Sequence, residues 1–474
     1  MKNMAVRLES IAVENFKNVK YGRLSFTNSR KNYKASVLGL YGQNGSGKTA
    51  IINALEILQL SLKGKAIPDK FVDYINVDAE FATLSFEFSV CSNNEKYQAF
   101  YEFKLHSEQA EISQNLDVDD NAQSHYRVLI IDELLSYSYE DDTIKLRKSP
   151  LIDTSSGKIF GPVGKYACLI GRDKETEMEL LVAKRVSAGD SRSFIFSREL
   201  LTAARNHGDG CNDNEYKRHM VLLEGLAHFG NFELFVIGTA NAGAISMNLL
   251  PLFFRYEYET SGAVGNLMLP LEEAAPIPEE AVELTERAIA NMNTVLSQLV
   301  PGLTIGVEKL GRMVYSNGKM GVKIQLMSLK NGKKIPLKYE SEGIKKIISV
   351  LQLLIVVYNY PSITVAIDEL DSGVFEYLLG ELLRIISEKG KGQLIFTSHN
   401  LRPLETLDRG FIAFTTTNPS NRYIRMTNVK DNNNLRDFYF RDIILGEQSE
   451  EVYDTTNNSE IALAFREAGE LCGA

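Results

Sequence analysis

A glycine-rich octapeptide carries the strongest chemical signal in this sequence. It reads Gly42-Gln43-Asn44-Gly45-Ser46-Gly47-Lys48-Thr49 and stands between two apolar runs, residues 37–41 and 50–55. Glycines let backbone N–H groups turn towards phosphate oxygens, a lysine such as Lys48 reaches the β- and γ-phosphates, and the hydroxyl of Thr49 suits Mg²⁺. The apolar flanks predict a strand before the loop and a helix after it, whose N-terminus adds a positive dipole. The segment therefore predicts a site for a nucleotide, with ATP and Mg²⁺ as its ligands.

Two later runs end in residues that would serve hydrolysis. The first, residues 362–367, is apolar and is followed directly by Asp368 and Glu369. This is the pattern in which the aspartate positions Mg²⁺ and the glutamate activates the attacking water. The second run, residues 393–397, leads to Ser398-His399-Asn400 and places an imidazole at the end of a strand. Because the carboxyl ends of parallel strands face the ligand, we expect these side chains beside the phosphate loop.

A serine and a glycine open the apolar helix expected before the Asp-Glu strand. The segment reads Glu340-Ser341-Glu342-Gly343, and a small hydroxyl residue with a glycine at a helix N-terminus can bind an anion. Taken alone, Ser341 fits an ordinary helix cap equally well. The order of phosphate loop, Ser-x-Gly helix, Asp-Glu strand and His strand favours the anion site. The uncharged stretch 347–367 has the length of a membrane span, but Pro361 interrupts it, which predicts a buried helix followed by a central strand.

This order of motifs resembles the ATP-binding-cassette (ABC) ATPases of the SMC/RecF/OLD group. The likeness covers residues 1–190 and 303–415 and includes the opening segment Ile11-Ala12-Val13-Glu14-Asn15-Phe16-Lys17. It implies that two heads sandwich ATP. The roles it implies are phosphate and Mg²⁺ binding by Lys48 and Thr49, Mg²⁺ support by Asp368, general base catalysis by Glu369, γ-phosphate sensing by His399, and completion of a neighbouring subunit's site by Ser341 and Gly343.

Two departures from the group's pattern make slow hydrolysis the expectation. No glutamine can be placed after the phosphate-loop helix, and the Ser-x-Gly segment lacks the usual Ser-Gly-Gly. One further segment, Ile131-Asp132-Glu133-Leu134, fits the Asp-Glu pattern. We expect no role for it in the site, because no histidine strand follows it and it lies in an antiparallel segment. The acidic run Asp117-Val118-Asp119-Asp120 is expected to be a solvated loop.

The fold implied is of the α/β class: a split ABC-ATPase head, with a mixed sheet around the phosphate loop and an antiparallel β-subdomain, and a mainly helical insertion. Alternating apolar residues predict a hairpin over residues 83–105 with its turn at 93–94, and Asn-Gly pairs predict turns at 317–318 and 331–332. Helical spacing predicts helices over 197–208, 215–229 and 278–299. The expected parts are 1–190 and 303–430 for the head, 191–302 for an arm that serves a partner or oligomerisation, and 431–474 for a tail with a short helix.

Composition and charge indicate which partners and which cellular compartment to expect. The chain has 474 residues, 44% hydrophobic content and a net charge of −9, so bulk electrostatics do not favour nucleic acid. Two basic clusters, residues 17–34 and 330–346, leave nucleic acid open as a partner, although solvated faces are the commoner explanation. The cysteines Cys91, Cys168, Cys211 and Cys472 show no metal or disulfide spacing, and the N-terminus lacks an apolar signal core. We expect a cytoplasmic protein without a membrane partner.

Within the SMC/RecF/OLD group, the length, the small insertion and the lack of a nuclease motif after Asn400 are similar to the ATPase subunits (the AriA family) of the PARIS anti-phage defence systems. That resemblance implies a homo-oligomer that holds a Toprim-like nuclease and releases it when a phage anti-restriction protein is sensed. Two alternatives stay open: a RecF/SMC-like DNA-repair ATPase that binds duplex DNA, and a scaffold that binds ATP without turnover.

Overall fold

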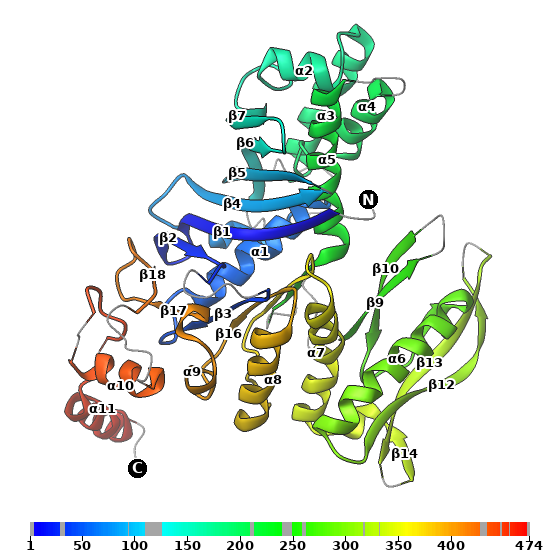
Figure 1. Ribbon diagram of the computed structural model, residues 1–474. Coiled ribbons are helices and arrows are strands. Elements are labelled where there is room, and N and C mark those ends of the chain that lie inside the picture. Colours follow the sequence, from blue (N-terminus) through cyan, green and yellow to red (C-terminus); the bar gives the residue numbers. More distant parts are fainter. Residues whose placement is uncertain are drawn as a thin grey trace, which may run out of the picture.

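The computed structural model of the chain describes residues 4–28, 34–92, 94–109, 126–208, 213–238, 249–257, 262–315, 318–330, 332–426, 434–445, 448–454 and 456–471. The acidic run 117–120 lies outside these residues. Two six-stranded sheets, one antiparallel and one mainly parallel, form the centre of the molecule (Figure 1).

The antiparallel sheet has the strand order β2-β1-β4-β5-β6-β7. Its strands are β1 (Met4–Phe16), β2 (Val19–Ser25), β4 (Phe81–Ser92), β5 (Glu95–Gln109), β6 (Tyr126–Glu140) and β7 (Lys145–Asp153). The predicted hairpin is confirmed as β4 and β5, which pair from Phe81 with His106 to Ser92 with Glu95. Its alternating apolar side chains are buried, as the period-two pattern requires.

The phosphate-loop sheet has the order β18-β17-β3-β16-β15-β8. Its strands are β3 (Ser36–Tyr41), β8 (Leu234–Ile237), β15 (Thr364–Ile367), β16 (Gln393–Thr397), β17 (Ile412–Thr415) and β18 (Tyr423–Ile424). All pairs are parallel except β17 with β18. Each of β3, β8, β15, β16 and β17 is buried at every residue, as is typical of parallel strands covered on both faces. Consequently β3, β15 and β16, three strands from distant parts of the sequence, end at one edge.

Helices cover both faces of the phosphate-loop sheet. α1 (Lys48–Leu62) lies between the two sheets, and its buried side chains join both in one core. On the opposite face, α7 (Glu342–Asn359), α8 (Glu376–Lys389) and α10 (Leu435–Leu445) pack in a second core. The end of α7 at Asn359 and the start of β15 at Thr364 confirm the predicted helix and strand. None of the helices in the described ranges is long and apolar enough to cross a membrane.

Two further lobes flank the centre. At the top of Figure 1, α2 (Val163–Leu169), α3 (Lys174–Gly189), α4 (Arg198–Gly208) and α5 (Asn214–His228) gather beyond β7. On the right, α6 (Glu279–Leu299) packs on β11 (Ala275–Pro278), β12 (Leu303–Val314) and β13 (Met320–Lys330), and β14 (Lys333–Pro336) pairs with β13. The two-stranded sheet of β9 (Leu249–Glu257) and β10 (Gly262–Pro270) stands beside α7.

The segment 191–302 differs from the mainly helical insertion that we predicted. Its three helices are present, and Ser197 and Asp213 cap α4 and α5. However, the segment also contains β8, β9, β10 and β11. Because β8 pairs with β15 inside the phosphate-loop sheet, the segment is not a single inserted arm. The sequence did not predict β8, because a four-residue apolar strand is too short to show a distinct period.

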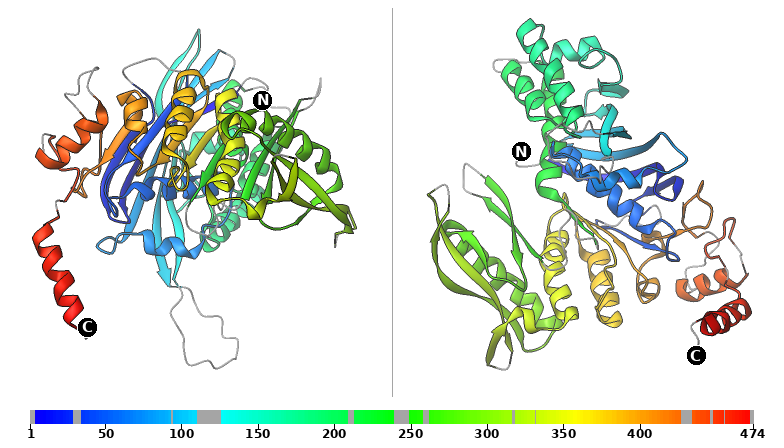
Figure 2. Two further views of the ribbon diagram at one scale, coloured as in Figure 1. Left: turned by 90° about the horizontal axis from the view of Figure 1, so that it is seen from below. Right: turned by 180° about the vertical axis from the view of Figure 1, so that it is seen from behind.

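The remaining short elements complete the chain. They are η1 (Asp69–Tyr74), η2 (Phe229–Glu233), η3 (Leu337–Tyr339), α9 (Pro403–Thr406), η4 (Arg409–Phe411) and α11 (Asn458–Leu471). Both views in Figure 2 show α11 at the periphery beyond α10.

Candidate ATP-binding site

The phosphate loop joins β3 to α1, as predicted. Gly42 has φ +150°, and a Cβ there would lie 1.7 Å from the Thr415 hydroxyl oxygen on β17. Gly47 has φ +92° and is the N-cap of α1. Both positions favour glycine, because side-chain-bearing residues rarely adopt such angles. Ser46 fixes the loop from within, since its hydroxyl contacts the carbonyl oxygen of Gln43 at 2.7 Å and the hydroxyl of Thr415.

Lys48 lies inside this loop. Its Nζ donates hydrogen bonds to the carbonyl oxygens of Gly42 at 2.7 Å and Gln43 at 2.9 Å. Burial lowers the pKa of Lys48, while the charges of Asp368, Glu369 and Asp371 oppose this shift. The ammonium group is thus held at the place where a nucleotide's phosphates are expected.

Asp368 links the loop to the second strand. Its side chain is 1% exposed, and its Oδ1 accepts hydrogen bonds from the hydroxyls of Thr49 at 3.4 Å and Thr397 at 2.6 Å. The same Thr397 hydroxyl accepts the backbone N–H of Glu369 at 2.7 Å. A carboxylate and a threonine hydroxyl side by side are hard oxygen donors of the kind that Mg²⁺ takes, so Asp368 and Thr49 fit the expected cation.

Glu369 and His399 both lie at the edge where the strands end. Glu369 follows β15 directly, has φ +48° and is exposed. His399 follows β16, the neighbour of both β15 and β3, and is also exposed. The structure therefore brings Lys48, Thr49, Asp368, Glu369 and His399 to one edge of the sheet, as the sequence predicted.

Asp371 ties the two strand ends together. Its Oδ2 accepts the backbone N–H groups of His399 at 3.0 Å and Asn400 at 2.9 Å. Its Oδ1 is buried and has no hydrogen-bond partner among the described residues. Lys346, from α7, reaches the carbonyl oxygen of Glu369 at 3.3 Å, and burial lowers its pKa to about 8 in spite of the nearby carboxylates. The Oδ1 atom of Asp371 is thus a buried acceptor at this edge that can receive a hydrogen bond from a ligand or a water molecule.

Ser341 and Gly343 lie apart from the phosphate loop. Ser341 is the N-cap of α7, and its Oγ accepts the N–H of Ile344 at 3.4 Å. Gly343 packs against the turn after the Asp-Glu pair, where a Cβ would lie 2.3 Å from the carbonyl oxygen of Gly373. No hydrogen bond within the described part of the chain joins either residue to the loop. In one copy, this helix start is therefore an exposed surface next to the Asp371–Gly373 turn.

Three side chains that shape the site were not predicted from the sequence: Thr397, Thr415 and Asp454. Thr397 bridges Asp368 and Glu369, and its place at a strand end next to His399 was an available signal. Thr415 packs on Gly42 and Ser46. Asp454, far along the chain, is bonded reciprocally to the loop: its N–H donates to Gln43 Oε1 at 2.8 Å, and Gln43 Nε2 donates to its Oδ2 at 3.3 Å. No sequence pattern marked Asp454.

No residue is assigned to the glutamine that the ABC pattern has after the phosphate-loop helix. β8 is the neighbour of β15, and the carbonyl oxygen of Ile237 accepts the N–H of Asp368 at 2.9 Å. The chain therefore leaves β8 beside the candidate metal ligand, and residues 239–248, which follow, lie outside the described residues.

Comparison with known proteins adds a coarse likeness of architecture. No family model matches the sequence, and no curated protein matches it significantly. Similar solved structures include an SMC head bound to the winged-helix domain of ScpA, with 13% identity, 89% of this chain and 98% of that chain covered, and a TM-score of 0.39. The SMC head domain from Thermotoga maritima has 14% identity, coverage of 89% and 99%, and a TM-score of 0.34. RecF bound to ATP has 13% identity, coverage of 83% and 94%, and a TM-score of 0.33.

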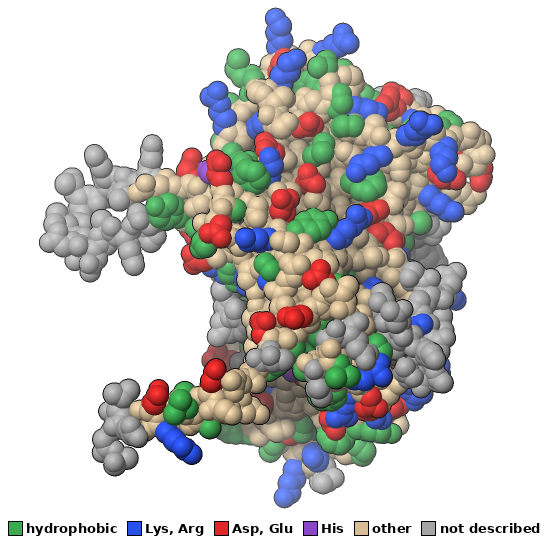
Figure 3. Space-filling model, turned by 90° about the vertical axis from the view of Figure 1, so that its left-hand side faces the viewer, with side chains coloured by type: hydrophobic (Ala, Val, Ile, Leu, Met, Phe, Trp, Pro, Cys, Tyr) green, Lys and Arg blue, Asp and Glu red, His purple; other side chains and the backbone are tan. Residues whose placement is uncertain are grey.

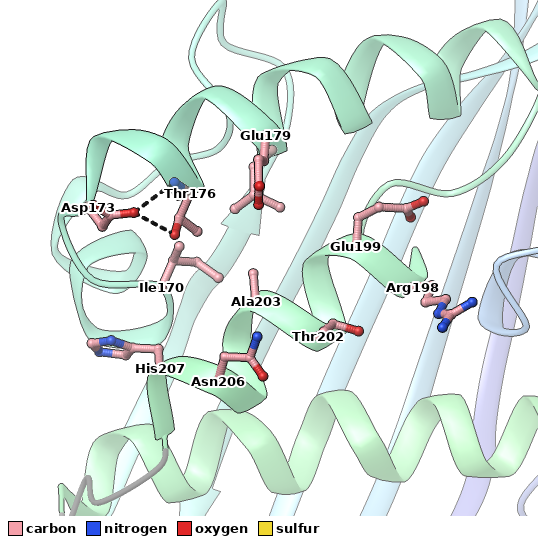
Figure 4. A pocket seen from close by; sticks show the side chains of 11 residues that line it. Ile170, Asp173, Thr176, Glu179, Arg198, Glu199, Thr202, Ala203, Asn206 and His207 are labelled. Carbon is pink, nitrogen blue, oxygen red and sulfur yellow. Dashed lines mark hydrogen bonds between the residues drawn. The ribbon is translucent and has the colours of Figure 1, made fainter.

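An open cavity of about 640 Å³ lies away from this site, between α3 and α4 (Figure 4). Its polar side chains do not converge on a common point in the view. Asp173 accepts the N–H and the hydroxyl of Thr176, both at 2.8 Å, as the N-cap of α3. This carboxylate is therefore committed to the helix start, and the lining mixes the donors Arg198 and His207 with the carboxylates of Glu179 and Glu199.

One group of potential metal ligands was not apparent from the cysteine spacing. The ligand atoms of Cys168, Asp213 and Glu215 lie within 4.8 Å of one another. Lys165 forms an ion pair with Glu215, and Asp213 accepts the N–H of Glu215 as the cap of α5. Because local partners already occupy both carboxylates, we assign no metal here.

Proposed function

We propose that this protein binds and hydrolyses ATP as an ABC-type ATPase. The observation that carries the proposal is the meeting of Lys48, Thr49 and Asp368, which come from two distant segments, at one sheet edge. A phosphate-binding lysine, a hydroxyl and a buried carboxylate form the minimal set for holding an ATP phosphate with its cation. Glu369 and His399 stand at the same edge.

Each residue has a distinct part in this proposal. Mg²⁺, when bound, would neutralise charge on the phosphates. Lys48 exchanges its two carbonyl contacts for phosphate oxygens, and Thr49 and Asp368 present oxygen atoms side by side. Glu369, exposed and held by the hydrogen bond from its N–H to Thr397, accepts a proton from the attacking water. Asp371 holds the chain at His399 in position through the two backbone hydrogen bonds.

A second copy would complete the site. Ser341 and Gly343 offer a helix N-terminus that forms no hydrogen bond with the phosphate loop among the residues that the structure describes. Such a helix start suits the γ-phosphate of a nucleotide bound to another copy, and the ATP-sandwich dimer of the ABC group provides this arrangement. The proposal therefore includes an ATP-dependent homo-oligomer.

Phosphate release from ATP by the purified chain tests the proposal. We expect slow, Mg²⁺-dependent release that Lys48→Ala abolishes through loss of ATP binding. Ser341→Ala is expected to lower turnover without lowering ATP affinity in the isolated copy. Equal turnover in wild type and Lys48→Ala would show that the activity does not come from this site.

We further propose that the ATPase serves as the sensor and scaffold subunit of an anti-phage defence complex. It would hold a Toprim-like nuclease and release it when a phage anti-restriction protein is sensed. The support is an ATP site without a second catalytic metal cluster in the described residues, so effector chemistry would come from another chain. Phage protection in the native operon that persists unchanged in Lys48→Ala and Glu369→Gln would contradict a nucleotide-driven role.

The DNA-repair alternative loses part of its motivation in the structure. Lys345 and Lys346, two members of the second basic cluster, are each 4% exposed. Lys345 is paired with Glu272 and Glu342, and Lys346 points to the ATP site. Binding of duplex DNA by the purified chain at low salt, weakening steeply as salt rises, would revive this alternative.

A further inference from the structure

The C-terminal helix α11 packs against no other element of the described chain, and the segment just before it is bonded to the phosphate loop. Every residue from Asn458 to Gly469 is exposed, including Ile461 (43%), Leu463 (55%) and Phe465 (77%). In Figure 3 this helix projects at the lower left with hydrophobic side chains among charged ones and with free space on its sides. A single helix of 14 residues is marginally stable alone in water, so its apolar side chains need a surface to cover.

The segment before α11 is firmly attached. Val452 is 2% exposed in the core with Phe438 and Tyr439, and the carbonyl oxygen of Glu451 accepts the N–H of Thr417 at 2.8 Å. Asp454 then makes its two hydrogen bonds to Gln43 of the phosphate loop. Because α11 begins only four residues later, at Asn458, it starts beside the face that a second copy must approach in an ATP sandwich.

The surface that could receive α11 lies next to Ser341 and Gly343, at the start of α7. Three exposed aromatic side chains lie close in the chain to the packed pair Gly343 and Gly373: Tyr339 (68% exposed) two residues before Ser341, and Phe375 (70%) and Tyr377 (55%) within four residues after Gly373. We call Tyr339, Phe375 and Tyr377 the aromatic patch. In a sandwich, the helix start at Ser341 of one copy faces the phosphate loop of the other, which brings the patch towards the root of α11.

We propose that α11 of one copy docks on the aromatic patch of a second copy when ATP joins the two heads. This inference rests on the ATP-sandwich dimer proposed above. α11 contains three glutamates and one arginine. Beside the patch, Lys338 and Arg402 lie over the rings of Tyr339 at 4.9 Å and Tyr377 at 5.3 Å. Because Arg402 is already paired with Glu405 and the exposed Glu376 adds a carboxylate to the patch, Lys338 is the cation that the glutamates of α11 would meet. Two-fold symmetry would bury both helices and both patches.

Dimerisation of the full chain in the hydrolysis-blocked Glu369→Gln background gives the first test. Sedimentation with ATP and Mg²⁺ would compare Phe465→Glu with Met178→Glu, a control with a matching exposed apolar residue (71%) on α3. We expect Phe465→Glu to weaken the dimer about tenfold or more, as for a buried aromatic at an interface, and the control to leave it unchanged. An unchanged dimer in Phe465→Glu overturns the docking but leaves the ATP dimer intact; a Glu369→Gln chain that stays monomeric refutes the dimer itself.

Crosslinking between different copies gives the second test. One chain carries Phe465→Cys and the other Tyr377→Cys, both with Glu369→Gln and with the four native cysteines Cys91, Cys168, Cys211 and Cys472 replaced by serine. Mixing them with ATP and a short bismaleimide should yield a crosslinked dimer that is absent without ATP. Crosslinking within one chain that carries both cysteines, without any crosslink in the mixture, would show that α11 folds back on its own head and would overturn the proposal.

Discussion

Two places in this chain have the same four residues in the same order and use them in opposite ways. Ile131-Asp132-Glu133-Leu134 lies in β6, and Ile367-Asp368-Glu369-Leu370 follows β15. In β6 the glutamate is buried, at 3% exposure, and the aspartate faces outward to an ion pair with Lys104 at 2.9 Å. After β15 the aspartate is buried and the glutamate is exposed.

Backbone geometry at one residue accounts for the inversion. In β6, two residues stand opposite one of β5, because Glu102 pairs with Leu134 and Lys104 with Ile131. Asp132 has φ +52° at this bulge, which turns Glu133 inward. After β15 the positive φ falls on Glu369 instead, so Asp368 keeps the inward position beside Thr49. The backbone geometry of the strand therefore decides which acidic residue of the motif is buried and which is exposed.

The partners of the two buried carboxylates differ in kind. Glu133 accepts hydrogen bonds from the Tyr101 hydroxyl and the Phe194 N–H, both at 2.7 Å, and from Ser193. Asp368 has two hydroxyl partners at the edge where Lys48 lies. The first carboxylate joins β5, β6 and the segment between α3 and α4 through hydrogen bonds. The second stands where a nucleotide is expected.

The largest expected difference concerns turnover. Glu369→Gln should lower the turnover number by about 10²- to 10⁴-fold, because the proposed general base is lost, and leave ATP binding intact. Glu133→Gln should leave the turnover of folded protein unchanged. Phosphate release and equilibrium ATP binding measure both variants. Comparable loss of turnover in Glu133→Gln would mean that the β6 motif takes part in the chemistry.

For stability, we expect the substitution at Glu133 to have a larger effect than the substitution at Glu369. Glu133→Ala should lower the free energy of unfolding by about 3 kcal/mol, since it leaves buried donors on Tyr101, Ser193 and Phe194 without an acceptor. Glu369→Ala, at an exposed position, should change it by no more than about 0.5 kcal/mol. Urea unfolding followed by circular dichroism compares them. A greater loss in Glu369→Ala would contradict the structural role of Glu133.

The pH dependence of stability isolates Glu133. Burial raises the pKa of this carboxyl in the folded protein, against the opposing effect of its hydrogen bonds. The folded state therefore binds the proton more tightly than the unfolded state, and the stability from protonation is lost as pH rises through the folded pKa. Relative to Glu133→Gln, the free energy of unfolding of the wild type should fall by at most about 1.4 kcal/mol per pH unit between the ordinary glutamate pKa of 4.5 and the raised pKa of the folded state. A difference independent of pH would show that Glu133 stays ionised throughout.

The smallest effect is expected at the outward carboxylate. Asp132→Asn removes a partly exposed ion pair with Lys104, which contributes no more than about 1 kcal/mol. The loss should shrink in 1 M NaCl, since salt screens exposed charges. Urea unfolding at low and high salt measures this. A loss above 2 kcal/mol that salt leaves unchanged would mean that Asp132 supports the bulge itself and not only the ion pair.

Local patterns were sufficient for several elements. Apolar alternation predicted β4 and β5, and caps and periodicity predicted α4, α5, α6 and α7. Context also separated the two Asp-Glu motifs, because only one lies before a histidine strand. The basic cluster 330–346 was less informative, since burial of Lys345 and Lys346 depends on what packs against α7 and not on their own spacing.

By itself, the sequence determined the phosphate loop, the strand that ends in Asp368 and the helix that begins at Ser341, because glycine geometry, apolar runs and caps act over a few residues. Only the tertiary structure decided that Thr397 bridges the acidic pair, that β8 enters the sheet and that Asp454 binds Gln43. These contacts join residues far apart in the chain. Their energies depend on strand order and on side chains meeting across the fold, which no local pattern encodes.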